Sequence, residues 1–268
     1  MGLFSLDGPF ARVNREAVLL LAGPRALLLQ LAHPLVAQGV ADHSGFLADP
    51  LGRLRRTLDA MLTIVFGDEA EARASAAAIR AVHERVHGTL AEATGRFAAG
   101  TPYDARDPEL ALWVHATLVD SARVAFECFV EPLGEAETER YYQESKTVAA
   151  LLEVPEAEMP ADHAAFRTWY EALLAGPVLE VTPTAARLAD AVLHPPIPLL
   201  PRALGDAASV VTVGLLPASI RERFALSWDP TRDAAWRAAR ALVRGALPLL
   251  PDLARTMPHA RRAQRQAR

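Results

Sequence analysis

Five of the eight histidines fall within the first 115 residues of the chain, and they are the side chains best suited to hold a metal or a cofactor. They are His33, His43, His83, His87 and His115. Imidazole is the commonest protein ligand for zinc, copper and iron, and helical bundles hold such ligands between facing helices. A lone histidine on an apolar helix face is usually a core residue bonded to a backbone carbonyl. The group therefore indicates a metal or cofactor site more strongly than any one of its members.

The string HERVH at residues 83–87 fits the pattern H-E-x-x-H. On a helix, imidazoles four residues apart share a face and can bind one zinc ion, with Glu84 as the general base. Arg85 is unusual between the glutamate and the second histidine, and no further histidine follows at the usual spacing. A zinc hydrolase and a purely structural pair of histidines both remain open from these residues alone.

Cationic side chains form a second set that could do chemistry. Arg53, Arg56 and Thr57 have the i, i+3, i+4 spacing that places them on one face of a helix. Arg25 lies between apolar runs, and a buried arginine needs an anionic or carbonyl partner because it cannot lose its charge. Either a carboxylate of a bound cofactor, such as a propionate, or an internal Asp or Glu would meet that need.

Helices must position these side chains, because helical periodicity and strong helix formers dominate the chain. We predict an all-α fold, a single helical-bundle-like domain with a buried cofactor pocket. Residues 10–245 would form the domain, and residues 246–268 would be a helix end followed by a basic tail that is frayed. The expected helices are 12–31 with a break at Gly23-Pro24, 53–66, 69–97, 108–130, 135–152, 161–174 and 230–244. The short runs 178–181 and 210–213 are the only strand candidates.

Composition excludes several classes of protein. The 268 residues carry a formal net charge of −4, which does not favour nucleic acid, and Cys128 is the single cysteine, so an internal disulfide framework or a cysteine-rich metal site is excluded. No apolar run is long enough to span a membrane without interruption, and no signal peptide is evident. We expect a cytoplasmic protein, and peripheral membrane contact stays open as an alternative.

Several blocks, in order, resemble one known family. They are GPRALLLQLAHPLVAQGVADHSGF at 23–46, RLRRT at 53–57, TIVFGDEAEA at 63–72, AVHERVHGTL at 81–90 and YDARDPELALWVHATLVDS at 103–121. Together they look like the oxygenase family that includes MpaB and latex clearing protein, the rubber oxygenase, over roughly residues 10–245. The resemblance implies an all-helical fold, one b-type haem with a histidine as proximal iron ligand, and cleavage of unsaturated hydrocarbon with dioxygen.

The resemblance assigns roles to individual residues. His83 matches the proximal iron ligand, and Arg53, Arg56 and Thr57 match a distal Arg-x-x-Lys-Thr pattern. Arg56 departs from that pattern because the rubber oxygenase has lysine there, and arginine cannot ligate iron. His115 falls where the rubber oxygenase has a histidine near the haem.

The same resemblance bears on two more residues and on the activity. Arg25 and His33 lie in a block shared by the wider family and are expected at the cofactor without a defined role. We therefore predict a haem b-dependent oxygenase acting on a hydrophobic, unsaturated isoprenoid or lipid-like substrate with dioxygen. The alternatives are the zinc hydrolase, a non-catalytic haem-binding protein and a structural helical protein.

Overall fold

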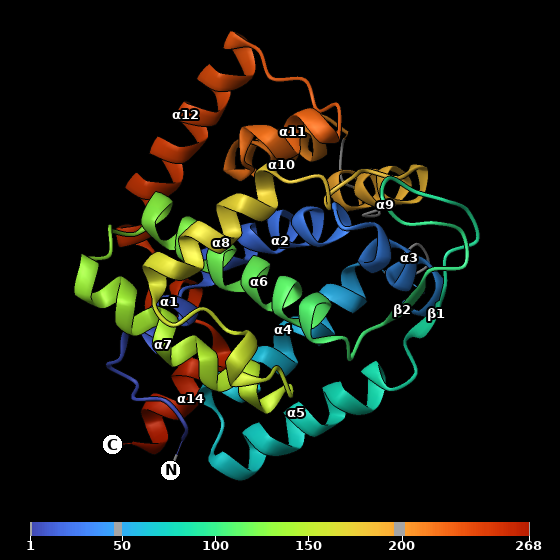
Figure 1. The fold of residues 1–268 in the computed structure, drawn as a ribbon. Coiled ribbons are helices and arrows are strands. Elements are labelled where there is room, and N and C mark those ends of the chain that lie inside the picture. The colour runs from blue at the N-terminus through green and yellow to red at the C-terminus, as the bar shows by residue number, and fades with distance from the viewer. Residues whose placement is uncertain (1, 46–49, 196–201, 268) are drawn as a thin grey trace.

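The computed structural model describes residues 2–45, 50–195 and 202–267, and in these residues the chain is almost entirely helical (Figure 1). The elements in the first half are α1 Pro9–Asn14, the 3-10 helix η1 Ala17–Leu21, α2 Ala22–Leu31, α3 Pro34–His43, α4 Pro50–Phe66, α5 Glu69–His83, β1 His87–Thr89, β2 Pro102–Asp104 and α6 Pro108–Phe129. Those in the second half are α7 Glu135–Leu151, η2 Glu156–Glu158, α8 His163–Ala175, α9 Pro183–Leu193, α10 Arg202–Leu215, α11 Ala218–Arg223, α12 Pro230–Ala246, η3 Leu247–Leu249, α13 Asp252–Arg255 and α14 Pro258–Gln266. This predominantly helical content confirms the predicted all-α class.

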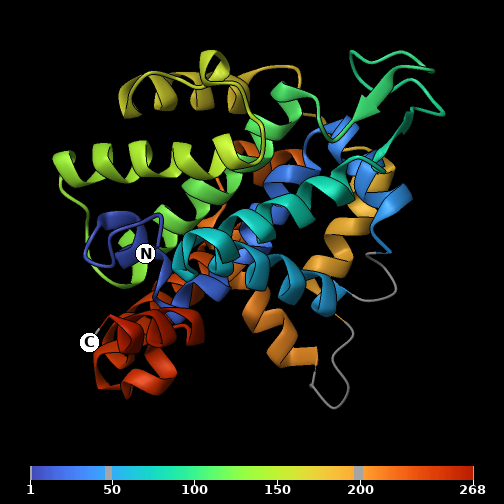
Figure 2. The same ribbon diagram turned by 90° about the horizontal axis from the view of Figure 1, so that it is seen from below.

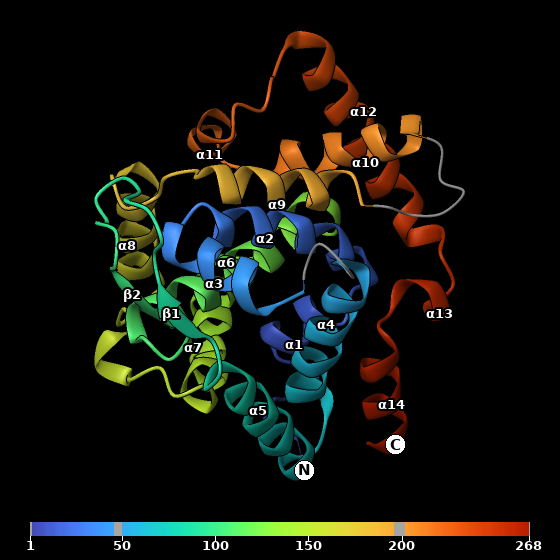
Figure 3. The same cartoon turned by 90° about the vertical axis from the view of Figure 1, so that its right-hand side faces the viewer.

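The helices α2 and α6 pack against each other in the interior of the molecule (Figures 1 and 2). Their facing side chains are apolar, with Leu28, Leu29 and Ala116 fully buried. Helix α7 flanks α6, and α9 and α10 flank α2. The helices α4 and α5 form an antiparallel hairpin at another side of this centre (Figure 3). Burial of the apolar stripe on each helix is what orients its polar residues.

Local capping explains where several predicted helices begin. Asp68 and Glu71 form a capping box at the start of α5, and the Asp107 carboxylate accepts from the backbone N–H of Glu109 at the start of α6. Asp229 does the same at α12, accepting from the backbone N–H of Arg232. The starts of α5, α6 and α12 therefore coincide with the sequence prediction.

Two predicted boundaries were wrong. The break in the first helical region lies between α1 and η1, whereas Gly23 and Pro24 lie in the first turn of α2, where the missing N–H of proline costs no hydrogen bond within the helix. Helix α5 ends at His83 rather than continuing to residue 97, because the chain turns into an antiparallel hairpin in which His87 pairs with Asp104. The runs 178–181 and 210–213 are not strands; the second lies within α10.

The basic tail is folded, which corrects the expectation that it is frayed. Helix α14 buries Ala260 and Ala263 against the core and packs on α4. His259 Nε2 lies 3.1 Å from a carboxylate oxygen of Asp59. Within the described part of the chain, no single helix combines the length and apolar character needed to cross a membrane. The segments 17–31 and 34–43 together have that length and apolar character, but the chain bends by 110° between them.

Candidate functional site

The register of the α4–α5 hairpin determines which predicted site residues face each other. The Ser75 hydroxyl on α5 donates to the Ala60 carbonyl on α4 at 3.0 Å. Antiparallel helices have the same rise per residue, so positions eight residues beyond Ser75 and eight before Ala60 lie at the same level. These positions are His83 and Gly52, and Arg53 is next to Gly52. By this register, His83 and the start of α4 lie at the same level of the hairpin, at its open end.

His83 is directed toward the interior side of α5. Ala72, Ala76, Ile79 and His83 follow one helix face by their i, i+4, i+7, i+11 spacing, and the two alanines are fully buried, Ala76 within the main core cluster. Burial lowers the pKa of the His83 imidazole from its ordinary value, so the ring is neutral at pH 7. Neither ring nitrogen has a hydrogen-bond partner among the described residues. A half-buried neutral imidazole of this kind has the chemistry of a metal ligand.

The predicted cationic face of α4 includes Ala60, whose backbone carbonyl contacts α5. Arg53, Arg56 and Thr57 precede Ala60 by seven, four and three residues, so they continue the stripe that carries the Ala60–Ser75 contact. Arg53 is half-buried, and Arg56 and Thr57 are exposed. Burial, together with the like charge of Arg56, lowers the pKa of the Arg53 guanidinium, which nevertheless stays charged. This end of the hairpin therefore combines a neutral imidazole with fixed positive charge.

A polar cluster from three elements, which the sequence pattern does not predict, holds the chain directly after His83. The Tyr103 hydroxyl on β2 donates to a carboxylate oxygen of Asp42 at 2.6 Å, and His43 Nε2 on α3 lies 3.1 Å from both the Tyr103 oxygen and the His87 carbonyl. A Cβ atom on Gly88 would lie 2.5 Å from the Tyr103 hydroxyl oxygen, so this position requires glycine. The sequence identifies His43 only as one of five histidines. Its proximity to Tyr103 depends on tertiary contacts, which helical periodicity does not predict.

The helical zinc site predicted from H-E-x-x-H does not form. Helix α5 ends at His83, and His87 is an exposed residue of β1, so the two imidazoles do not share a helix face. Among the described residues no group of three or more His, Cys, Asp or Glu side chains is placed to hold a metal ion. Within the described part of the chain, the five histidines therefore supply no such group of three ligands.

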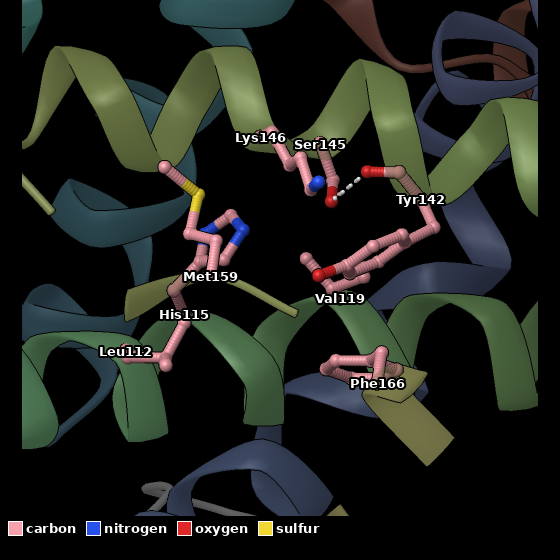
Figure 4. Close-up of a pocket in the computed structure, with 8 residues that line it drawn as sticks. All are labelled: Leu112, His115, Val119, Tyr142, Ser145, Lys146, Met159 and Phe166. Atoms are coloured by element: carbon pink, nitrogen blue, oxygen red, sulfur yellow. Dashed lines mark hydrogen bonds between the residues drawn. The ribbon is translucent and has the colours of Figure 1, made fainter. Parts of the chain in front are cut away.

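His115 lies apart from the hairpin, between α6, α7 and α8. It lines a small cavity of about 10 Å³ with Leu112, Val119, Tyr142 and Met159, together with Ser145, Lys146 and Phe166 (Figure 4). That volume is close to the space one water molecule occupies. Burial lowers the pKa of His115 to about 4, so the ring is neutral at pH 7. No residue of α4 or α5 lines this cavity.

His33 occupies a third position, at the N-terminal end of α3. Its ring lies 5.6 Å from the Phe97 ring, and its buried Nδ1 has no hydrogen-bond partner among the described residues. Burial lowers the pKa of His33 to about 4, with Asp107 opposing this shift and Arg96 adding to it. An unpaired buried ring nitrogen costs free energy, so His33 remains a residue to which a ligand or water could bind.

Arg25 has the internal partner that its position required. Its Nη2 donates to the Asp120 carboxylate at 2.7 Å, its Nη1 to the Ser121 hydroxyl at 2.6 Å and its Nε to the Leu215 carbonyl at 2.8 Å. Burial alone would raise the pKa of Asp120, but Arg25 and Arg123 together hold it below its usual range. Of the two partners considered for Arg25, a cofactor carboxylate or an internal acid, the structure contains the acid.

Comparison with known proteins agrees with the resemblance seen in the sequence. A family described as "ER-bound oxygenase mpaB/B'/Rubber oxygenase, catalytic domain" matches residues 11–245. The chain belongs to this family. Two similar proteins are the uncharacterized proteins Rv2237 of Mycobacterium tuberculosis and Mb2261 of Mycobacterium bovis. Each is 26% identical over 233 residues, covering 85% of this chain and 88% of the relative. No solved structure matches the chain significantly.

Membership of the mpaB/rubber oxygenase family assigns the chain to an oxygenase catalytic domain and hence to the enzymes. The matched residues include the whole α4–α5 hairpin, the polar cluster that follows it and the interior helices α2 and α6. The open end of the hairpin carries the half-buried imidazole of His83 on α5 and, at the same level of α4, the cationic residues Arg53 and Arg56. It is the candidate active site.

Proposed function

We propose that this chain is a haem b-dependent oxygenase that uses His83 as the iron ligand and acts on a hydrophobic substrate with dioxygen. The observation that carries the proposal is the position of His83, a neutral imidazole without a hydrogen-bond partner, at the same level of the hairpin as the Arg53 end of α4. A cofactor that needs one imidazole ligand fits these residues, whereas a metal ion that needs three protein ligands does not.

At this end of the hairpin, His83 suits haem as a ligand, and the cationic residues of α4 suit it through their charge. His83 would hold the iron through a ring nitrogen, because a neutral imidazole keeps a lone pair for the metal. When bound, haem b would supply a redox-active iron that can react with dioxygen. The remaining requirements, an apolar enclosure and compensation of charge, must be met by this chain.

Arg53, Arg56 and Thr57 would provide that compensation. Arginine stays protonated at any working pH, so Arg53 and Arg56 keep positive charge at the site and stabilise negative charge as it develops on a reacting oxygen. The Thr57 hydroxyl can donate a hydrogen bond to the same region. Arg56 stands where the rubber oxygenase pattern has lysine, and because arginine keeps its proton it would supply charge and hydrogen bonds and not a ligand atom.

The substrate proposed is an unsaturated isoprenoid or lipid-like molecule. The family supplies the oxygenase chemistry, and a chain that is 51% hydrophobic can enclose apolar matter in a pocket with few polar groups. Family membership does not fix the substrate, since related sites take different molecules on one fold.

Visible absorption spectroscopy of the purified chain, produced with sufficient haem, tests the proposal. We expect a Soret band at one haem per chain that is lost or strongly shifted in His83→Ala. His87→Ala is the matched control, because this exposed histidine of the same string should leave the spectrum unchanged. Oxygen consumption with unsaturated lipids should follow the Soret band across the variants.

Three results would contradict the proposal. A Soret band unchanged in His83→Ala would show that another residue is the ligand. A Soret band that depends on His83, without oxygen consumption on any unsaturated lipid, would favour the non-catalytic haem-binding protein. Stoichiometric zinc without a Soret band would favour the hydrolase.

A further inference from the structure

The segment after α12 exposes an unusual number of large apolar side chains. Of the six large hydrophobic residues that are exposed in the described part of the chain, four lie between residues 242 and 253. Leu242 and Leu253 are each 73% exposed, Leu249 is 84% exposed and Leu250 is 43% exposed. All except Leu242 lie beyond the residues that match the oxygenase domain. A cluster of exposed leucines in one segment usually marks a surface that is covered in the working protein.

The fold holds this segment in place on both sides. Leu247 is buried in the main core cluster and anchors the end of α12. On the other side, the Met257 N–H donates to the Arg15 carbonyl at 2.7 Å, and Arg255 pairs with buried Glu16 at 2.9 Å. The leucines therefore project from a fixed turn, and α12, α13 and α14 follow one another along one side of the molecule (Figure 3).

A basic groove adjoins Leu253, the last of these leucines. It has a volume of about 390 Å³ and is lined by Leu253 and Pro258 and by the α14 residues Arg261, Arg262, Arg265 and Gln266. Arg262 pairs with Glu71 at 2.8 Å. The guanidinium groups of Arg261 and Arg265 bond to no described residue, and the buried Arg261 Nε has no acceptor. Unpaired arginines around a groove attract anions, phosphates in particular.

We propose that this leucine–arginine surface, formed by Leu249, Leu250, Leu253, Arg261 and Arg265, docks the protein on an anionic phospholipid membrane. The leucines would enter the boundary between headgroups and acyl chains, and the arginines would contact the lipid phosphates. Exposed apolar residues flanked by arginine are the combination that binds an interface between water and anionic lipid. The surface is separate from the His83 end of the hairpin, so the proposal does not depend on haem.

Charge argues for a membrane over a second copy of the chain. A symmetric dimer formed through this surface would bring the unpaired Arg261 and Arg265 of both copies toward each other, and like charges at an interface are unfavourable. An anionic bilayer neutralises the same charges. Asp252 is the acidic residue within the segment, and its carboxylate accepts a hydrogen bond from the Thr256 hydroxyl at 2.6 Å.

Vesicle co-sedimentation of the full chain tests the proposal. We expect binding to vesicles of phosphatidylcholine with phosphatidylserine and much weaker binding to phosphatidylcholine alone. The double variant Leu249→Glu/Leu253→Glu should bind the anionic vesicles about 50-fold or more weakly, because two apolar contacts are lost and two negative charges are added. Arg265→Glu, which keeps the leucines, should weaken binding about 5-fold or more. Val82→Glu is the matched control, an apolar residue 51% exposed on α5, and it should bind like the wild type.

Several outcomes would overturn the inference. Wild-type protein that does not distinguish the two vesicles, or a folded double variant that binds as well as the wild type, would each do so. So would a wild-type dimer in sedimentation velocity that becomes monomeric in the double variant without any vesicle binding, since a second copy would then cover the surface. If the double variant has a lower thermal midpoint than Val82→Glu, the Arg265→Glu result decides.

Discussion

The ion pair between Arg25 and Asp120 allows a direct test of whether Arg25 serves the fold or a cofactor. Both side chains are buried, at 3% and 8% exposure, and Arg25 makes three hydrogen bonds. Removing one partner of a buried pair costs about 3–5 kcal/mol, because the other charge is left uncompensated. Arg123 stays 3.2 Å from the other oxygen of Asp120, so we expect Arg25→Met to cost about 3 kcal/mol, at the lower end of that range.

A double-mutant cycle measured by urea unfolding of the haem-free protein provides the assay. Asp120→Asn should also cost about 3–5 kcal/mol, since it leaves Arg25 buried without a counter-ion. The combined variant Arg25→Met/Asp120→Asn should recover part of this loss, with a coupling energy of about 2 kcal/mol or more. The pKa of Asp120 is lower in the folded than in the unfolded protein, so its contribution is present above about pH 4 and is lost as the pH falls further. Arg25→Met should therefore show a shallower loss of stability in acid than the wild type.

One result would refute the reasoning. Suppose that the haem-free Arg25→Met variant has a free energy of unfolding within about 0.5 kcal/mol of the haem-free wild type, yet no longer retains haem. Arg25 would then compensate a carboxylate of the bound cofactor, and its pairing with Asp120 would be incidental.

Three further predictions concern other parts of the fold. The pKa of His115 is about 4 in the folded protein and near 6.5 in the unfolded protein, so its neutral form contributes up to roughly 3 kcal/mol of stability above pH 6.5, and this contribution is lost as the pH falls to 4. Urea unfolding of His115→Leu should therefore show a smaller loss of stability over this pH range. A pH dependence of stability equal to that of the wild type would contradict the lowered pKa of His115. Tyr103→Phe removes the hydrogen bond to Asp42 and should lower the free energy of unfolding by about 1 kcal/mol, with faster proteolysis between residues 84 and 105. Gly88→Ala should lower the free energy of unfolding by more than this, because its Cβ would overlap the Tyr103 hydroxyl. Asp68→Ala removes the N-cap of α5 and should cost about 1 kcal/mol, whereas a change below about 0.3 kcal/mol would mean that the capping box contributes little.

The helices that the sequence predicted best are those defined by local interactions. The predicted starts of α5, α6 and α12 agree with the structure because aspartate caps lie directly before them, and the predicted end of α4 agrees because Gly67 and Asp68 separate it from α5. The prediction failed where a helix end depends on distant residues. Helix α5 stops at His83 because the following residues pair with β2 and bond to α3, and no residue near position 84 signals this.

The sequence by itself determined that the chain is helical, which side chains share a helix face, and that its blocks match an oxygenase domain. Periodicity reports the face on which Arg53, Arg56 and Thr57 lie because the helix repeat is fixed. It does not report what that face meets, since pairing of helices depends on packing between segments far apart in the chain. Only the tertiary structure decided that His83 lies level with the start of α4, that Arg25 is neutralised by Asp120, and that His115 lines a separate small cavity.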